Sequence, residues 1–576
     1  MPEFPNPQQD PGMERRLLLV FALTFLVIIL FQPLLKKYLP QAPTSPTTPA
    51  PAQSSSQPLT STDSHAPIPT GGATKQAASE TETVVENDLY RVVFTNRGAQ
   101  VKSWILKKYK DDHGNPLDLV SSATLNYGYP LSLWTYDENL RNKINSGLYV
   151  ASASGPQTAP TQLAFEYSDQ DLTVRKAFRF DHTYVVHVET SVVQQGRLVS
   201  AFALWPAGFG DQISPASYAA SRIEHQFNGD TERLEIKKVS GGGTIAGPFN
   251  WAGVVDQYFT AVFLPDDAQS AAAITLRNSI DIPKDWRSPK PGETIKTDVL
   301  GVGVGNLKGP VSERLYVGPK ALAVLESIPV PTIAGAPQDL RSLVNFGFFG
   351  VIARPLFLWL KWTYEKILHN WGWAIVLQTL IINLALLPLR IASMKSALKM
   401  QKVAPQIKAI QEKYKKYSMR DPRKQEMNQE ISALYKTEGV NPVGGCLPML
   451  IQMPFLFAYY SMLGAAIELR QAPWLWIHDL SSRDPYFVLP VALVVSMVAS
   501  QRIMPQPGMD PAQQKMMTLM MPLMMGFLFF NLAAGLNLYY SLGNLIGIVQ
   551  QAVMNRTGLG REMRELALKR ARKREK

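Results

Sequence analysis

Residues 371–390 read WGWAIVLQTLIINLALLPLR and contain no ionisable side chain before Arg390. The length suits a bilayer, whose hydrocarbon core an α-helix crosses in about 20 apolar residues. Thr379, Asn383 and Arg390 are spaced by four and seven residues, so they share one face of such a helix. Because lipid cannot satisfy polar groups, the stretch predicts a transmembrane helix whose polar stripe faces other helices or a hydrated cavity.

A strongly basic segment follows this helix. Residues 390–445 contain twelve Lys or Arg and five Asp or Glu, a net charge of +7, and basic loops of this length stay in the cytoplasm. Apolar residues recur at helical spacing on both sides of a turn at residues 418–424, so residues 391–441 predict a cytoplasmic helical hairpin. Its basic side chains include Lys408, Lys413, Lys415, Lys416, Arg420, Arg423 and Lys424.

Four further apolar segments follow the hairpin, and each predicts another transmembrane helix. They span residues 446–467, 486–502, 516–532 and 536–553, with an outer loop at 468–485 and an inner loop at 503–515. The second and third of these are short for a bilayer span, which indicates shielding by neighbours or a locally thinned membrane. The last segment carries a second polar stripe, formed by Asn537, Ser541, Asn544 and Gln551. Two stripes on two helices indicate one shared polar site.

The N-terminal residues predict a membrane anchor and a tether. Residues 17–35 are apolar, follow Arg15 and Arg16, and precede no small-x-small cleavage site, so residues 1–37 are interpreted as an uncleaved signal-anchor helix. Residues 38–80 consist mainly of Pro, Ser, Thr, Ala and Gln and cannot bury enough apolar surface to fold. They predict a disordered linker.

A large β domain is expected after this linker. Residues 81–330 alternate apolar and polar side chains between turns rich in Gly, Asn and Asp, which predicts an all-β domain of two packed sheets. Residues 331–370 mix aromatic residues with scattered charges and predict an amphipathic helix at the membrane interface. The expected fold class is therefore an α-helical polytopic membrane protein with six transmembrane helices, an all-β domain outside the cytoplasm and a cytoplasmic helical hairpin.

The net charge of +12 is concentrated in two segments. One is the hairpin, and the other is the tail at residues 554–576, where nine basic and three acidic residues give +6. Basic segments beside apolar spans indicate positive-inside topology and attraction to anionic lipid. Contact with ribosomal RNA is a second interpretation of the tail, and its candidate residues are Arg561, Arg564, Lys569, Arg570, Arg572, Lys573 and Arg574.

The β domain contains none of the motifs that mark common catalytic sites, namely a nucleophile elbow, a phosphate loop or a metal-ligand cluster. His182 and His187 are five residues apart and would point to opposite faces of a sheet, which disfavours a metal pair. A sugar-binding cleft stays open as an alternative to a scaffold role. We expect no enzymatic activity, no metal and no cofactor, and the single cysteine, Cys446, excludes an internal disulfide.

Several segments resemble the signature segments of YidC membrane insertases. In the C-terminal part these are NPVGGCLPMLIQMPFLFAYYSML (441–463), ELRQAPWLWIHDLSSRDPYFVLP (468–490), DPAQQKMMTLMMP (510–522) and GLNLYYSLGNLIGIVQQ (535–551). In the outer domain they are VVFTNRGAQVKSWILKKY (92–109) and YVGPK (316–320). The resemblance covers nearly the whole chain and implies the Gram-negative type, in which a large periplasmic β-supersandwich follows the first of six membrane spans.

The resemblance implies a protein of the bacterial inner membrane, with both termini in the cytoplasm, that moves transmembrane segments of nascent proteins into the bilayer, alone or with the Sec translocon. In this family five core helices enclose a hydrophilic groove that is open to cytoplasm and lipid. The groove residues implied here are Thr379, Asn383, Arg390, Gln452, Asn537, Tyr540, Ser541 and Asn544. The implied partners are nascent membrane proteins, the Sec translocon, the ribosome, targeting factors and anionic phospholipids, and a monomer is compatible with this function.

One position departs from the family pattern. The family usually places an arginine five residues before the proline that matches Pro388, and this sequence has Asn383 there. Arg390 lies on the same stripe about 10 Å nearer the cytoplasm, at 1.5 Å per residue. We therefore expect Arg390 to supply positive charge only near the mouth of the groove.

Two alternatives compete with the groove. A solute transporter or channel would need paired ionisable groups at the membrane midplane and internal repeats, whereas this chain offers amides and no visible repeat. Intramembrane amides also act as bonds between helices, worth about 0.6 to 2 kcal/mol each. A dry, tightly packed arrangement of residues 379, 383, 537 and 541 would therefore argue against a water-filled recess.

Overall fold

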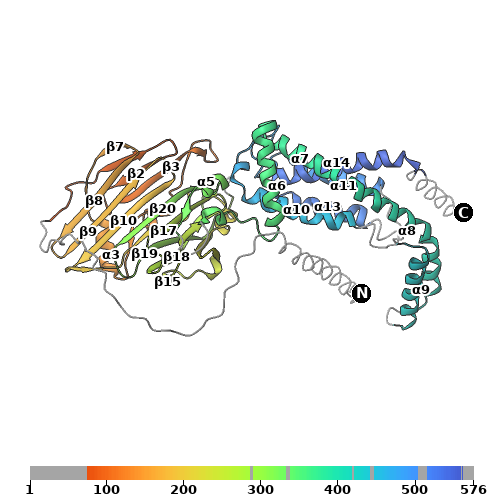
Figure 1. Cartoon of the computed structure of the whole chain (residues 1–576), viewed down its shortest axis with the longest axis horizontal. Coiled ribbons are helices and arrows are strands. Elements are labelled where there is room, and N and C mark those ends of the chain that lie inside the picture. Colours follow the sequence, from red (N-terminus) through yellow and green to blue (C-terminus); the bar gives the residue numbers. More distant parts are fainter. Residues whose placement is uncertain are drawn as a thin grey trace, which may run out of the picture. The chain divides into compact units, whose positions relative to one another are not determined.

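The structure is a computed structural model that describes residues 74–285, 290–331, 338–417, 421–440, 447–503, 516–558 and 561 (Figure 1). The predicted signal-anchor helix, most of the predicted linker, most of the inner loop at 503–515 and nearly all of the basic tail lie outside these residues. The described chain has a β-rich part that ends at Asp339 and a helical part that begins at Gly350. This division confirms the predicted combination of a β domain with a helical C-terminal part.

Three large sheets make up the β-rich part of the described chain. The first sheet contains, in spatial order, β4 (Pro116–Asp118), β3 (Gln100–Lys110), β2 (Tyr90–Thr95), β1 (Glu82–Glu86) and β7 (Gly155–Thr158). The second contains β14 (Asp230–Glu235), β13 (Arg222–Phe227), β16 (Trp251–Val255), β17 (Phe259–Pro265), β20 (Val311–Pro319), β10 (Val185–Gln194), β9 (Leu172–Phe180), β8 (Thr161–Asp169) and β6 (Val150–Ala151), with β11 (Arg197–Leu198) paired to β10. The third contains β15 (Gly243–Ala246), β18 (Ala271–Pro283), β19 (Thr294–Asn306), β12 (Phe202–Trp205) and β5 (Leu133–Trp134).

Smaller elements complete this part. A two-stranded ribbon pairs β21 (Pro329–Val330) with β22 (Gln338–Asp339). Four short helices are α2 (Thr124–Tyr127), α3 (Glu138–Ser146), α4 (Pro215–Ala219) and α5 (Leu322–Glu326). The ribbon extends the β domain beyond the predicted boundary at residue 330.

Alternating side chains build the core of the β domain. Strand β9 alternates buried and more exposed residues along its whole length, as the sequence predicted. Phe94 of β2 has its ring centroid 5.0 Å from that of Phe178 of β9, and Trp104 of β3 lies 6.1 Å from Trp205 of β12. The three sheets therefore share one aromatic core. The prediction of two sheets was wrong, because β12 and β18 each pair with β19 and form a third sheet separate from the ten-stranded one.

A carboxyl group is buried in this core. The Glu313 side chain on β20 is 1% exposed, and neither of its oxygens has a hydrogen-bond partner among the described residues. Burial raises the pKa of this carboxyl well above its ordinary value, and the charge of nearby Asp266 raises it further. The folded chain therefore keeps a proton on Glu313 that the unfolded chain loses above a pH of about 4.3.

Replacing Glu313 with glutamine should stabilise the β domain at neutral pH. Because the folded pKa of this carboxyl is raised, the free energy of unfolding falls as the pH rises from the unfolded pKa to the folded pKa. The fall is about 1.4 kcal/mol per pH unit, and glutamine, which does not titrate, removes it. Thermal unfolding of the detergent-solubilised chain should show a gain at pH 7.5 that vanishes near pH 4.5. The same change at exposed Glu293 serves as the control. An equal gain at both pH values would contradict the buried-acid explanation.

The helical part begins with two helices joined by a sharp bend. Helix α6 (Gly350–Thr363) continues into a π-helical turn at Tyr364–Leu368, and α7 (Trp371–Ala385) follows after His369 adopts φ +48°. The Asn370 side chain caps α7 by accepting a hydrogen bond from the backbone N–H of Trp373 at 3.1 Å. The amphipathic helix predicted for residues 331–370 therefore starts only at Gly350, after β22.

The remaining helices follow the predicted order. They are α8 (Leu387–Lys413), α9 (Arg423–Thr437), α10 (Leu447–Ala465), α11 (Val488–Ile503), a π-helical turn (Met516–Met520) with α13 (Met521–Phe529), and α14 (Ala534–Asn555). Helices α8 and α9 pack through Val403, Ile407, Ile431 and Leu434, and Lys413 bonds Glu430 at 2.8 Å. The predicted helix over 371–390 is divided at Leu386, because Pro388 has no N–H to continue the helical bonds of α7.

Length and hydropathy set the requirements for a helix that spans a bilayer. Within the described ranges, no one helix meets them alone, while Gly350–Leu368 and Trp371–Ala385 meet them jointly, across a 114° bend. Shorter apolar helices occur at Leu450–Ala465, Val488–Ile503 and Thr518–Phe529.

Candidate functional site

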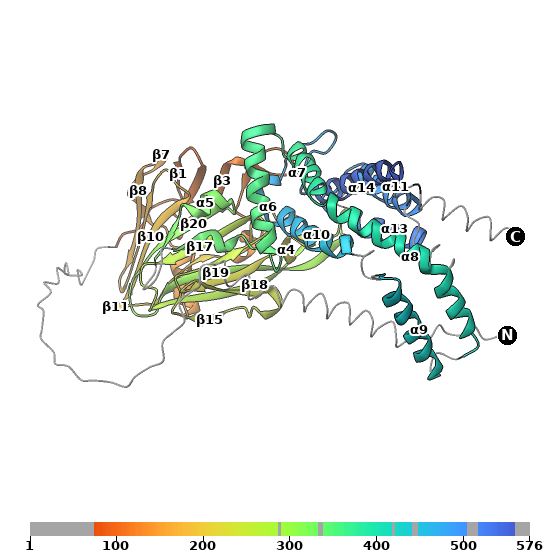
Figure 2. The same ribbon diagram turned by 45° about the vertical axis from the view of Figure 1, so that its right-hand side comes forward.

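Helices α7 and α14, which carry the two predicted polar stripes, pack together (Figures 1 and 2). Gly543 of α14 marks this point. A methyl group added to Gly543 would lie 3.7 Å from Nδ2 of Asn383 on α7 and 3.9 Å from Nε2 of Gln452 on α10. Two amide side chains, from α7 and α10, therefore lie beside the same glycine of α14.

Arg390 is tied to this place by a network of hydrogen bonds. Its Nη2 donates to Oδ1 of Asn383 and its Nη1 to Oε1 of Gln550, each at 2.8 Å. Gln550 in turn donates from Nε2 to the Asn383 carbonyl at 3.2 Å. Gly547 lies directly beside the guanidinium, because a Cβ there would be 2.7 Å from Nη1. The positive charge is thus held between α7, α8 and α14.

This contact corrects the expectation that Arg390 acts only near the mouth of a groove. Helical side chains point toward the N-terminus of their helix, and the arginine side chain is long enough to cover the two turns back to Asn383. The guanidinium therefore occupies the neighbourhood of position 383 even though residue 383 is an asparagine.

Four of the predicted groove residues lie in a packed interior. The exposed fractions are 0% for Thr379, 1% for Asn383, 0% for Asn537 and 9% for Ser541. Thr379 donates to the Ile375 carbonyl at 2.7 Å, and Asn383 Nδ2 donates to the Thr379 carbonyl at 2.8 Å. These four side chains are therefore enclosed by neighbouring helices, and the predicted hydrated groove stays a prediction.

Asn537 and Ser541 bond to neighbouring helices instead of facing solvent. Asn537 Nδ2 donates to the carbonyls of Phe529 and Leu532 at 3.1 and 3.3 Å, which satisfies the C-terminal end of α13. Ser541 Oγ donates to the Leu489 carbonyl of α11 at 3.2 Å. These two residues hold α13 and α11 to α14, the role that intramembrane amides and hydroxyls take between helices.

The other four predicted groove residues are half-buried, and they are Arg390, Gln452, Tyr540 and Asn544. Asn544 Nδ2 is buried with no hydrogen-bond partner among the described residues. An unpaired buried donor is unfavourable by about 1 to 3 kcal/mol, so an incoming carbonyl or water molecule would be bound there. Among these four residues, Asn544 therefore keeps a donor available for such a partner.

Three residues of this region have roles that the sequence pattern did not reveal. Gln378 accepts a hydrogen bond from the Tyr459 hydroxyl and donates to the Leu356 carbonyl at 3.0 Å, which links α7 to α10 and α6. Gln550 and Gly547 hold Arg390. The sequence feature that could have predicted this packing is the pair of glycines at 543 and 547. Glycines four residues apart on a helix let a neighbouring helix or side chain approach closely.

A compact loop covers the opposite end of α7. Trp474 lies on Gly372, and its ring is 5.7 Å from that of Trp373 in an edge-on arrangement. Asn370 Nδ2 donates to the Pro473 carbonyl at 3.1 Å. The Asp484 carboxylate, which is 0% exposed, accepts from the backbone N–H of Leu489 at 2.7 Å and so caps α11. This loop fixes the ends of α7 and α11.

The predicted hairpin and tail residues are mostly exposed where the structure describes them. Lys408, Lys415, Lys416 and Arg423 are exposed, Lys424 is half-buried, and Arg561 is exposed at the end of the described chain. The predicted contacts of Arg420, Arg564, Lys569, Arg570, Arg572, Lys573 and Arg574 lie outside the described residues.

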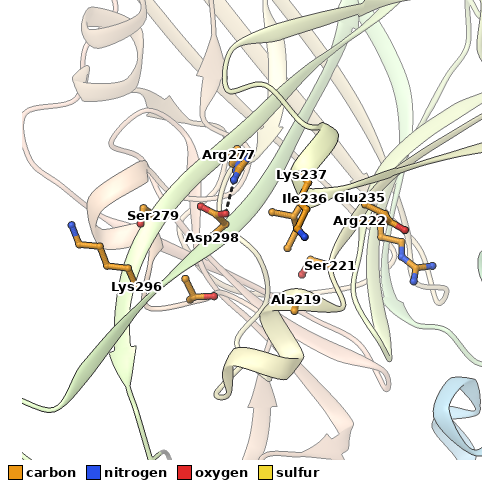
Figure 3. Close-up of a pocket in the computed structure, with 11 residues that line it drawn as sticks. Ala219, Ser221, Arg222, Glu235, Ile236, Lys237, Arg277, Ser279, Lys296 and Asp298 are labelled. Carbon is orange, nitrogen blue, oxygen red and sulfur yellow. Dashed lines mark hydrogen bonds and ion pairs between the residues drawn. The ribbon is translucent and has the colours of Figure 1, made fainter. Parts of the chain in front are cut away.

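The β domain contains a hollow lined by charged side chains. It has a volume of about 610 Å³ and lies between β13, β14, α4 and the β18–β19 ribbon (Figure 3). Its charged lining residues are Arg222, Glu235, Lys237, Arg277, Lys296 and Asp298, and Arg277 pairs with Asp298 at 2.8 Å. In the described part of the chain, no three His, Cys, Asp or Glu side chains are placed to hold a metal ion. The scaffold interpretation of this domain stays a prediction.

Comparison with known families and proteins assigns the chain. Residues 82–359 match the family model of the YidC periplasmic domain, and residues 362–561 match that of the 60Kd inner membrane protein. The chain is 32% identical over 538 residues to the membrane protein insertase YidC of Geobacter metallireducens, covering 88% of this chain and 93% of that protein. It is 31% identical to YidC of Bordetella avium, covering 84% of this chain and 85% of that protein.

Solved structures include a YidC insertase with its first transmembrane domain resolved, which matches at 19% identity and a TM-score of 0.34 over 84% of this chain and 95% of that chain. Family models cover nearly the whole described chain, and full-length relatives exceed 30% identity. The chain therefore belongs to the YidC family of membrane protein insertases.

Proposed function

We propose that this insertase receives the polar segment of a nascent membrane protein at the level of Arg390, Gln452 and Asn544, while the apolar segment of the client enters lipid. The observation that carries the proposal is the Arg390 guanidinium, which is half-buried and bonded to Asn383 and Gln550 between three helices. Moving a charged side chain across the bilayer centre is unfavourable by about 3 kcal/mol or more. A fixed cation partway along the path lowers that barrier for an acidic client segment.

The proposed site is smaller than the groove expected from the family. Thr379, Asn383, Asn537 and Ser541 form its packed back wall, because each is buried and donates a hydrogen bond to a backbone carbonyl. Arg390, Gln452, Tyr540 and Asn544 form the surface that contacts the client. The chain acts without covalent chemistry, since binding and partial desolvation of the client are sufficient for insertion.

The proposed topology has six membrane crossings with both termini in the cytoplasm of a bacterial cell. Positive charge supports it, because the hairpin carries +7 from twelve basic and five acidic residues in 390–445. The single crossing before the β domain is residues 17–35, and this places the domain in the periplasm. Helices α7, α10, α11, α13 and α14 form the proposed core bundle, and α8 with α9 forms the cytoplasmic hairpin.

Crosslinking tests the proposed client site. A photo-activatable amino acid at position 452 or 544 should crosslink to the polar tail of a stalled single-span client, because both side chains are half-buried at the site. The control position is Leu384, which follows Asn383 on α7 and is 53% exposed. Tail crosslinks of equal strength from position 384 would overturn the placement of the client.

The proposed partners are the ribosome, the Sec translocon, targeting factors and anionic phospholipids. The exposed lysines of the hairpin and the basic tail support contact with RNA and lipid headgroups, both of which carry phosphate. Binding to RNA and binding to lipid require separate tests, since the same basic side chains attract both.

Removing the residues after Arg561 should weaken binding to ribosomes. The removed segment carries seven basic and three acidic residues, so the affinity should fall by about tenfold and the loss should shrink as salt is raised. Co-sedimentation with ribosomes at low and moderate salt measures this. A control variant that exchanges the order of the tail residues but keeps their charge should bind normally, and weak binding by that variant would indicate sequence-specific contacts.

A further inference from the structure

The face of α14 that meets α8 is built around the guanidinium of Arg390. Gly547 has no side chain, and the guanidinium occupies the space that a Cβ would need, 2.7 Å from Nη1 and 3.6 Å from Cζ. Gln550, three residues further along α14, accepts from Nη1 at 2.8 Å and donates to the Asn383 carbonyl at 3.2 Å. One glycine and one glutamine thus fix the position of a charge that belongs to another helix.

We propose that Gly547 and Gln550 are positioning residues that hold the Arg390 guanidinium against Asn383. The cation of the site is then supplied across the interface between α8 and α14 instead of by residue 383 itself. This inference rests on the proposed function, in which Arg390 faces the acidic segment of the client.

The planar guanidinium suits this arrangement. It presents several N–H donors in fixed directions, so it bonds to Asn383 and Gln550 at the same time. A lysine ammonium has no such fixed geometry and would not hold both partners in one orientation. Among the described residues, the guanidinium donates to Asn383 and Gln550 and has further N–H donors for a client carboxylate.

The interface continues along both helices past Arg390. Gln551 Nε2 donates to Sδ of Met394 at 3.5 Å, and Met554 packs against Met394 and Leu398. Helix α14 therefore holds the first turns of α8, the helix that runs on to Lys413. Any shift of α8 along α14 would move the guanidinium away from Asn383.

The test compares two alanine substitutions one turn apart on α14. Gly547→Ala adds a methyl group within 2.7 Å of the guanidinium, whereas the matched control Gly543→Ala adds one at ordinary contact distances of 3.7 and 3.9 Å. Each purified full-length variant is placed in lipid vesicles with single-span clients whose translocated tails carry either two aspartates or two asparagines.

Gly547→Ala should slow insertion of the aspartate client by about fivefold, the size expected when one partly screened charge contact is lost. It should leave the asparagine client within about twofold, and Gly543→Ala, whose methyl group would lie beside Asn383 and Gln452, should change insertion of both clients by the same factor. Equal slowing of both clients by Gly547→Ala would overturn the inference, because a packing defect does not depend on client charge.

A double-mutant comparison separates this inference from the proposed function. If Gly547 acts through Arg390, adding Gly547→Ala to Arg390→Gln should cause no further loss, while additive losses would overturn the positioning role. If Arg390→Gln leaves the aspartate client unaffected, the proposed function fails as well. If Gly547→Ala prevents folding, Gln550→Leu serves as the second variant, because it removes the other partner of Arg390. It should reproduce the client-selective loss. Full activity of Gln550→Leu on the aspartate client would overturn the inference.

Discussion

Replacing Arg390 with glutamate should reduce insertion of a client with an acidic translocated tail by at least about tenfold, which corresponds to about 1.4 kcal/mol. The substitution removes the cation that bonds Asn383 and Gln550 and puts a carboxylate in its place. Like charges repel the client tail at the proposed Arg390 site, and the half-buried position weakens screening by solvent. Insertion into vesicles, followed by protease protection of the tail, measures the loss.

A client with the opposite charge gives the decisive control. If the Arg390 site contacts the translocated tail, exchanging the tail aspartates for lysines should restore insertion by Arg390→Glu and impair insertion by the unchanged protein. Arg390→Lys keeps the charge but loses the planar set of N–H donors. With the acidic client its insertion rate should lie between those of the unchanged protein and Arg390→Glu, with a loss of about threefold. Equal failure of Arg390→Glu with acidic and basic clients would show that the residue only stabilises the fold.

Replacing Gly372 with alanine should destabilise the helical part by about 1 to 3 kcal/mol, the usual effect of overfilling a packed interior. A Cβ at this position would lie 2.1 Å from Cδ1 and 2.2 Å from Cγ of Trp474. The indole is buried and its loop also fixes the start of α7 through Asn370, so it has little freedom to move. Thermal unfolding of the detergent-solubilised protein should show the change as a lower midpoint.

The matched control for this substitution is Gly464 near the end of α10. A Cβ there meets no other atom within 4 Å, so alanine should leave the unfolding midpoint unchanged or slightly higher, because it favours the helix. A Gly372→Ala protein as stable as the Gly464→Ala protein would show that the loop moves aside without loss.

Periodicity predicted much of this architecture because it reports which faces of an element are buried. The alternation in β9 and the apolar runs of α10, α11 and α14 appear in the structure near the expected residues. Periodicity failed at Leu386, where the helix predicted for residues 371–390 is divided into α7 and α8. The break depends on Pro388, and a hydropathy pattern carries no information about the missing N–H of a proline.

The site was predicted only in outline. A stripe of polar residues shows that a helix face needs partners, but it does not distinguish water from a neighbouring backbone carbonyl. Thr379 and the amide nitrogen of Asn537 donate to backbone carbonyl oxygens inside the bundle, while Asn537 Oδ1 is buried with no hydrogen-bond partner among the described residues. The contact between Arg390 and Gln550 joins residues 160 positions apart, and no local pattern encodes such a pair.

The absence of a side chain at Gly547 has an evolutionary consequence. A relative with arginine in place of Asn383 needs no guanidinium from the next helix. The residue at its position of Gly547 is therefore free to be larger. A relative with asparagine at that place and arginine at the position of Arg390 must keep the gap. Across the family these three positions should therefore change together. A large residue at the position of Gly547 should be selected against in relatives that have both the asparagine and the arginine.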